Sequence, residues 1–162
     1  MPHKRDAAVS RAPSGASTVL MQRVKGLADT PWMRAGLPFF SREKRWINEQ
    51  HLKVCRVPAP TFREQDRADY LLCSFRRIGG QSRIDDAGNV VTPLVFEKGL
   101  PFVALTAHMD TALAGHHFSD VVVQPDGTFQ GPGVTDNGSG LAGLLAVARL
   151  LTETPPPKLG RN

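Results

Sequence analysis

The sequence has few cysteines and lacks a long apolar run. Its two cysteines, Cys55 and Cys73, do not have the CxxC spacing of a zinc knuckle, so we expect reduced, buried thiols and a cytoplasmic protein. Residues 1–23 lack the continuous apolar run of a signal peptide, although their content of Arg and Ser with few acids leaves a transit peptide as an alternative. No window has the length of a membrane span, and we expect no membrane partner.

Cations are also missing from a long stretch of the chain. Between Gly99 and Ala148 there are four aspartates and no lysine or arginine. The net charge of +5 comes largely from residues 1–40, where six bases face two acids. Because this segment lacks interleaved aromatics and a basic helical face, we expect a flexible basic leader over residues 1–16 and no nucleic-acid partner.

The length of 162 residues, with 41% hydrophobic and 22% charged residues, fits one globular domain with a single core. Apolar spacing predicts four helices, over residues 18–28, 41–54, 61–78 and 141–151. Ser41 is the expected N-cap of the second helix, and Thr61 with Glu64 has the form of a capping box for the third. The fourth helix is apolar on nearly every side, which indicates that it is buried.

The apolar pattern changes to that of strands after Gly80. Strands are predicted over residues 82–85, 90–96, 102–107, 121–123 and 128–129. The strand over 102–107 is fully apolar, which is typical of a strand covered on both faces in the middle of an α/β sheet. Three prolines after the last helix predict an irregular tail over residues 155–162.

A His-x-Asp pair, His108 and Asp110, follows this apolar strand directly. Ligands bind at the carboxyl ends of strands in open α/β sheets. An imidazole there can bind a metal while a nearby carboxylate accepts its other N–H group and fixes the tautomer. The alternative is an ordinary hydrogen-bonded histidine in a loop.

Asp136 lies in a glycine-rich loop, residues 131–140, that leads into the last helix. It could simply cap that helix. The absence of cations from the surrounding sequence favours a divalent metal instead, since a phosphate site would be expected to include Lys or Arg, and neither GxGxxG nor GxxxxGK[ST] is present.

Four ordered motifs resemble those of zinc-dependent aminoacylases and peptidases. They are Pro58-Ala59-Pro60-Thr61-Phe62-Arg63-Glu64, Asp85-Asp86-Ala87-Gly88-Asn89-Val90, Ala107-His108-Met109-Asp110-Thr111 and Gly131-Pro132-Gly133-Val134-Thr135-Asp136. The family includes acetylornithine deacetylase, succinyl-diaminopimelate desuccinylase, carboxypeptidase G and the tripeptide aminopeptidase peptidase T. The resemblance implies hydrolysis of peptide or N-acyl amide bonds, and the sequence after Asp136 is closer to zinc aminopeptidases with Asp-Asn-x-Ser-Gly.

The same resemblance implies a fold and a set of site residues. The fold would be part of a three-layer α/β/α catalytic domain with a mixed sheet, over residues 17–154, without its C-terminal half and lid domain. His108 would be a zinc ligand, Asp136 the carboxylate that bridges two zinc ions, and Asp110 the catalytic-site residue that orients His108. Two metals about 3.5–4 Å apart polarise the scissile carbonyl and lower the pKa of bridging water.

The residues after Asp136 lack the other half of such a site. They contain one carboxylate, Glu153, and no histidine or cysteine, whereas the family continues with a Glu-Glu pair that supplies the general base and a further ligand. We therefore expect a truncated chain that is inactive alone. The alternatives are a non-catalytic remnant that acts as an interaction module, self-associating through an unpaired sheet edge, and a weak metal-binding module.

Overall fold

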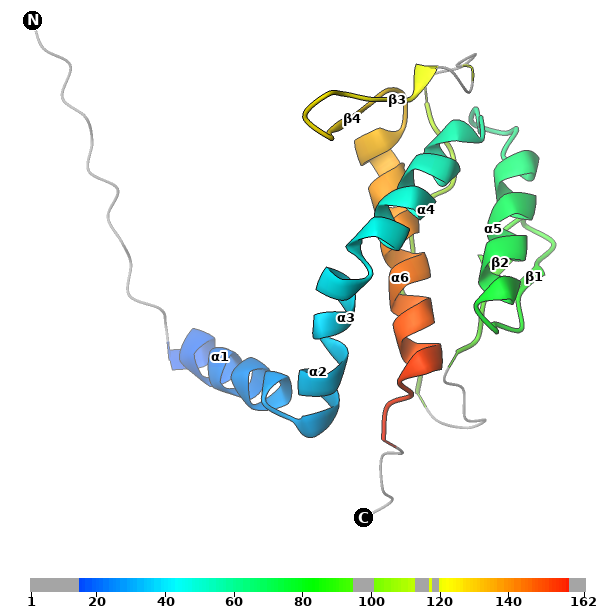
Figure 1. Cartoon of the computed structure of the whole chain (residues 1–162). Coiled ribbons are helices and arrows are strands. Elements are labelled where there is room, and N and C mark those ends of the chain that lie inside the picture. The colour runs from blue at the N-terminus through cyan, green and yellow to red at the C-terminus, as the bar shows by residue number, and fades with distance from the viewer. Residues whose placement is uncertain (1–14, 95–100, 113–116, 118–119, 158–162) are drawn as a thin grey trace, which may run out of the picture.

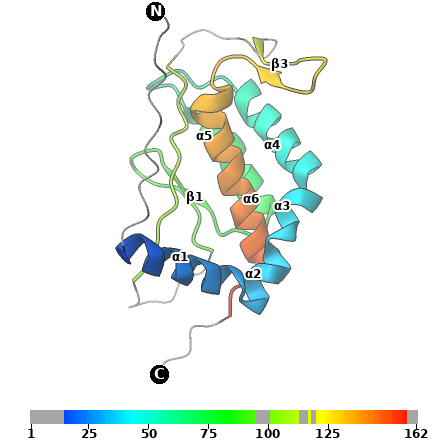
Figure 2. The same ribbon diagram turned by 90° about the vertical axis from the view of Figure 1, so that its left-hand side faces the viewer.

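The computed structural model describes residues 15–94, 101–112, 117 and 120–157. Its centre consists of three helices: α4 (Lys44–Arg56), α5 (Gln65–Arg77) and α6 (Ser139–Glu153). Both α4 and α5 contact α6, which runs beside them in Figures 1 and 2. The last predicted helix is thus confirmed as the buried centre of the molecule, since six of its residues are buried.

The core joins these three helices through their apolar stripes. Val54 of α4, Leu71 and Phe75 of α5, and Leu141 with Leu145 of α6 are each at most 9% exposed. The spacing of Leu71 and Phe75 at i and i+4 is the one that predicted α5. A second, smaller cluster surrounds Phe39, Ala146 and Leu150.

The segment before α4 is divided among shorter helices, and the N-cap prediction for Ser41 is wrong. α1 spans Gly15–Ala28, α2 Pro31–Gly36 and α3 Pro38–Arg42. Ser41 lies inside α3, and α4 begins after Glu43. Thr30 caps α2, with its hydroxyl accepting the Met33 N–H group at 3.4 Å and Pro31 in the first helical position.

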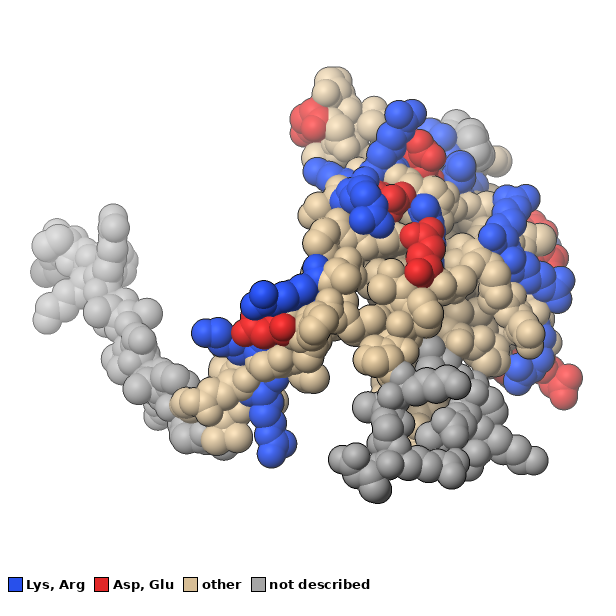
Figure 3. Space-filling view, turned by 60° about the horizontal axis from the view of Figure 1, so that its bottom comes forward, with Lys and Arg blue, Asp and Glu red and all other residues tan. Residues whose placement is uncertain are grey.

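α1 stands away from the three-helix body (Figures 1 and 3). The large apolar residues of α1 are between 52% and 66% exposed to solvent. They are Val19, Leu20, Met21, Val24 and Leu27. The flexible leader was predicted over residues 1–16, and residues 1–14 of it lie outside the described part of the chain. Within the described residues, no helix is long and apolar enough to cross a membrane.

Two antiparallel hairpins form at four of the predicted strands, where each observed strand is two residues long. β1 (Arg83–Ile84) pairs with β2 (Val90–Val91), and the Asp85 carboxylate accepts backbone N–H groups across the turn. β3 (Val122–Val123) pairs with β4 (Phe129–Gln130). The described residues therefore contain helices and short sheets, as in part of an α/β domain. No central sheet with helices on both faces is formed by these residues.

The predicted strand over residues 102–107 is wrong. The segment forms no strand, and Phe102, Val103 and Leu105 are 74%, 88% and 59% exposed. A strand requires a hydrogen-bonded neighbour, and none of the described strands lies beside this segment. The predicted burial on both faces is wrong for the same reason.

The cysteine prediction is half confirmed. Both thiols are free, but only Cys55 is buried, whereas Cys73 is exposed on α5. Cys55 is the next-to-last residue of α4, and its thiol lies against the loop that contains Gly133 and Gly138.

Candidate metal centre

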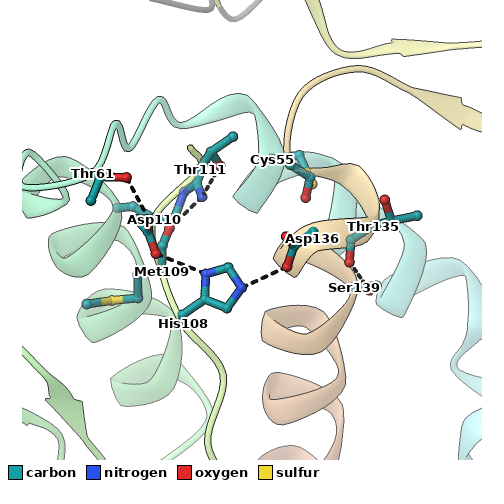
Figure 4. A network of polar contacts seen from close by, with 11 residues as sticks. Cys55, Thr61, His108, Met109, Asp110, Thr111, Thr135, Asp136 and Ser139 are labelled. Atoms are coloured by element: carbon teal, nitrogen blue, oxygen red, sulfur yellow. Dashed lines mark hydrogen bonds and ion pairs between the residues drawn. The ribbon is translucent and has the colours of Figure 1, made fainter. Parts of the chain in front are cut away.

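His108 lies between two carboxylates, and these are the ones that the sequence singled out (Figure 4). Its Nδ1 atom is 3.0 Å from Asp110 Oδ1, and its Nε2 atom is 2.8 Å from Asp136 Oδ1. Residues two apart on an extended chain point to the same side, which places Asp110 within reach of the ring. The structure thus brings together all three site residues expected from the sequence, across 28 residues of chain.

The three side chains differ in their exposure to solvent. Asp110 is 29% exposed, His108 is 48% exposed and Asp136 is 87% exposed. The site is therefore most exposed at Asp136 and partly covered at Asp110. An exposed carboxylate–imidazole contact of this kind contributes little to stability.

Hydrogen bonding shifts two of these groups from their ordinary titration ranges. The pKa of His108 is raised, first by its hydrogen bond to Asp136 and then by the one to Asp110, although partial burial opposes the shift. The pKa of Asp110 is lowered, first by a hydrogen bond from the Thr61 hydroxyl and then by His108. Asp110 is accordingly held as an acceptor, which suits a residue that fixes the ring of His108.

Thr61 does not cap α5 as predicted. Its hydroxyl donates to Asp110 Oδ2 at 2.8 Å instead, and α5 begins only at Gln65. Glu64 accepts the backbone N–H group of Phe62 at 2.6 Å, and Phe62 has a φ of 69° in the left-handed region. The expected capping box is thus replaced by a turn whose threonine supports the site.

The backbone of the glycine-rich loop before Asp136 is held by α4. His51 Nε2 is 2.7 Å from the carbonyl oxygen of Val134, and the Cys55 thiol donates to that of Gly133 at 3.7 Å. A side chain on Gly138 would collide with the sulfur of Cys55. The two α4 residues, four positions apart, therefore fix the loop that carries Asp136.

Sequence reasoning missed Arg67, a cation that lies against the site. The aspartates of residues 99–148 are far from Lys and Arg in sequence, but Arg67 approaches from α5 and donates to the carbonyl oxygen of Met109 at 2.6 Å. Burial lowers its pKa, and the negative charge of Asp110 is among the influences that raise it. The sequence did contain one indication that Arg67 points inward. It lies four residues before Leu71, and residues four apart on a helix face the same side, so an arginine there is on the face that buries Leu71.

The donor atoms fit a zinc ion in kind but are too few for a complete site. Imidazole and carboxylate are ordinary zinc ligands, and the Nδ1 contact with Asp110 leaves Nε2 as the atom for the metal. Zinc sites normally have three or more protein ligands. No group of three or more His, Cys, Asp or Glu that could hold a metal occurs among the residues that the structure describes.

Part of the sequence that contains this site matches a known family. Residues 89–160, fewer than half of the chain, match the model of peptidase family M28, and this stretch includes His108, Asp110 and Asp136. The match supports a zinc-dependent metallopeptidase type of family, but it does not support the particular deacylases, carboxypeptidase or tripeptide aminopeptidase that the motifs resemble. No curated protein matches the chain.

Proposed function

We propose that the chain is the N-terminal part of the catalytic domain of a zinc-dependent peptidase or N-acyl amide deacylase. The single observation that carries the proposal is the placement of His108 between Asp110 and Asp136, at 3.0 Å and 2.8 Å. The similarity of residues 89–160 to peptidase family M28 supports it. The complete domain would have the three-layer arrangement implied by the motifs.

In this proposal each residue has a distinct role. His108 Nε2 and the Asp136 carboxylate would hold metal, with Asp136 shared between two zinc ions, and Asp110 would keep the Nδ1 proton of His108 in place. A zinc pair supplies Lewis acid and a water of lowered pKa for attack on the scissile carbonyl. Thr61 orients Asp110 through its hydroxyl group.

We expect the chain alone to bind zinc weakly and not to turn over substrate. Two protein donors leave a zinc ion with fewer ligands than a stable site has, and neither His108 nor its two partners is placed to act as a general base while bound in these roles. The substrate class is a peptide or N-acyl amino acid.

Calorimetric titration with zinc tests the assignment of the ligands. Zinc uptake is expected to be lost in His108→Gln and in Asp136→Asn and to be weakened in Asp110→Asn. His117→Gln is the matched control, because His117 is an exposed histidine outside the site. Uptake that persists in His108→Gln would overturn the ligand assignment.

A hydrolysis assay tests the expected inactivity separately. A panel of dipeptides and N-acyl amino acids is incubated with the chain and added zinc or cobalt. No turnover above the His108→Gln background is expected. Robust, chelator-sensitive turnover by the wild-type chain would contradict the claim that it is inactive alone.

A second candidate function, an interaction module, is favoured by the exposure of residues 101–107. Phe102, Val103 and Leu105 lie in the open on an extended, uncharged segment. We propose a second copy of the chain as the occupant, since two uncharged apolar segments of the same sequence can pair without repulsion between charges.

Light scattering coupled to size exclusion tests this second candidate. The wild type is expected to shift from monomer to dimer with rising concentration, and Val103→Lys is expected to stay monomeric. Val123→Lys is the control, because Val123 is 49% exposed but already paired in a hairpin. A wild type that is monomeric at all concentrations would rule the candidate out.

A further inference from the structure

Arg67 is the largest of the fully buried side chains, although it carries a charge. Only 1% of the residue is exposed, whereas the nearby Arg63, Arg76 and Arg77 face solvent. No carboxylate among the described residues lies within ion-pair distance of its guanidinium group; hydrogen bonds to neutral oxygens satisfy it instead. Such burial is costly, and Arg is retained where its fixed fork of donors is needed.

The donors of Arg67 connect two separate segments. Nε and Nη2 donate to the carbonyl oxygen of Val57, at 2.9 Å and 2.6 Å, just after α4. Nη1 donates to the carbonyl oxygen of Met109 at 2.6 Å and to the hydroxyl group of Thr111 at 3.0 Å. One planar group therefore fixes the segment that contains His108 and Asp110 against the end of α4.

The alternation of an extended chain explains why Arg67 can do this without contacting the imidazole. His108 and Asp110 point to one side, toward Asp136, while Thr111 points to the other (Figure 4). Arg67 thus holds the segment from the side opposite the proposed metal ligands.

Thr111 carries this restraint to the loop of Asp136. Thr111 is 2% exposed, and its N–H group donates to the carbonyl oxygen of Ala59 at 2.8 Å. Gly133 packs directly on it, because a Cβ atom at Gly133 would lie 2.6 Å from Thr111 Oγ1. The Gly133 carbonyl oxygen in turn accepts the N–H group of Gly138, which closes the turn around Asp136.

We propose that Arg67 is a positioning residue that, through Thr111 and Gly133, sets the placement of His108 relative to Asp136. The expected effect on zinc affinity rests on the proposed function. The placement of His108 itself can be measured without metal. Substitution of outer-shell partners of metal ligands typically lowers metal affinity by about 10–100-fold.

The test compares Arg67→Met, Arg67→Lys and Thr111→Val with Arg63→Met, an exposed arginine two residues before α5. Thr111→Val removes the hydroxyl group that accepts from Arg67 and keeps the shape of the side chain. It therefore still tests the proposal if Arg67→Met fails to fold. Urea unfolding followed by circular dichroism reports whether each variant is folded.

Two measurements are made on every folded variant. Long-range ¹H–¹⁵N spectra of the metal-free chain report the ring nitrogens of His108, identified by loss of their signals in His108→Gln. Competition with a chromophoric chelator reports zinc affinity. We expect Arg67→Met and Thr111→Val to shift the His108 ring signals and to weaken zinc binding about tenfold, Arg67→Lys to recover part of the loss, and Arg63→Met to match the wild type.

The outcomes separate the inference from the proposed function. Unchanged ring signals and affinity in folded Arg67→Met and Thr111→Val would overturn the inference while leaving the proposed function intact. A wild type that takes up no zinc, with ring signals that still move in the Arg67 variants, would overturn the proposed function and support the positioning role. Equal shifts in Arg63→Met would also overturn the inference, because they would show a non-specific effect of removing charge.

Discussion

Replacing Gly133 with alanine is expected to destabilise the chain far more than the same change at another glycine of similar backbone conformation. Gly133 has a φ of +71°, in the left-handed region, and a Cβ atom there would lie 2.6 Å from Thr111 Oγ1. Two separate costs therefore act at this position. One is backbone strain, and the other is collision with a side chain that is itself fixed by Arg67.

The magnitude follows from adding the two costs. A left-handed conformation costs a residue with a Cβ atom about 1–2 kcal/mol. Overpacking of a tight contact adds about 1–3 kcal/mol. The expected loss in the free energy of unfolding for Gly133→Ala is therefore about 2–5 kcal/mol.

Gly88 supplies the matched control. Its φ is +86°, and a Cβ atom would meet nothing within 4 Å, so Gly88→Ala has the backbone cost alone, about 1–2 kcal/mol. In a Thr111→Ala background the collision at Gly133 is relieved, and the cost of Gly133→Ala should fall toward that of Gly88→Ala.

Urea unfolding followed by the fluorescence of the two tryptophans, of which Trp46 packs against the core, measures the stability of all four variants. The reasoning is refuted if Gly133→Ala costs no more than Gly88→Ala, or if its cost is the same with and without the Thr111 side chain. Either result would mean that Gly133 does not pack on Thr111 as the structure has it.

Four further predictions concern stability and reactivity. Gly143 is exposed within α6 and a Cβ atom there would meet nothing, so Gly143→Ala should raise the unfolding free energy by about 0.5–1 kcal/mol in urea titrations. Burial raises the pKa of the Cys55 thiol from 9.0 to about 11, so iodoacetamide at pH 9 should label only Cys73 in the native chain, with two labels by mass spectrometry contradicting this. Since the unfolded thiol ionises first, Cys55 should also make stability fall between pH 9 and 11. Arg149→Met should cost about 1–2 kcal/mol, because Arg149 stacks on the Trp46 ring at 4.6 Å and pairs with two glutamates; an unchanged urea midpoint would contradict it.

The helices were largely predictable from the sequence because their apolar spacing is local. The stripe of Leu71 and Phe75 is sufficient to indicate α5 and its buried face. The start of α5 was not predictable, because the Thr61 hydroxyl group can form either of two hydrogen bonds. One would cap the helix locally. The other, to Asp110, joins residues 49 apart in the sequence, and it is the one that forms.

The site itself was predictable to the extent that it depends on short spacing. A histidine and an aspartate two residues apart on extended chain reach one another without any tertiary information. Arg67 could not be found in the same way, because its acceptors Met109 and Thr111 are 42 and 44 residues distant. The absence of cations from a stretch of sequence therefore did not imply their absence from the space around Asp110.

The expected strand over 102–107 failed for a related reason. Apolar composition indicates that a segment can be buried, but burial requires a neighbour that the segment itself does not specify. Phe102 and Val103 remain exposed because no described strand pairs with them.

If His108 and Asp136 hold metal as proposed, the residues packed behind them limit the direction from which further ligands can approach. Arg67 and Thr111 occupy the space behind the segment of His108, and Cys55 lies against the loop of Asp136. A donor from that direction would displace buried contacts and would bring the metal closer to the buried charge of Arg67, which is unfavourable in a low dielectric. The Asp136 carboxylate, 87% exposed, is open on the opposite side. In the proposed function, further donors are therefore expected from the solvent-facing side of Asp136 and not from the side of Arg67 and Cys55.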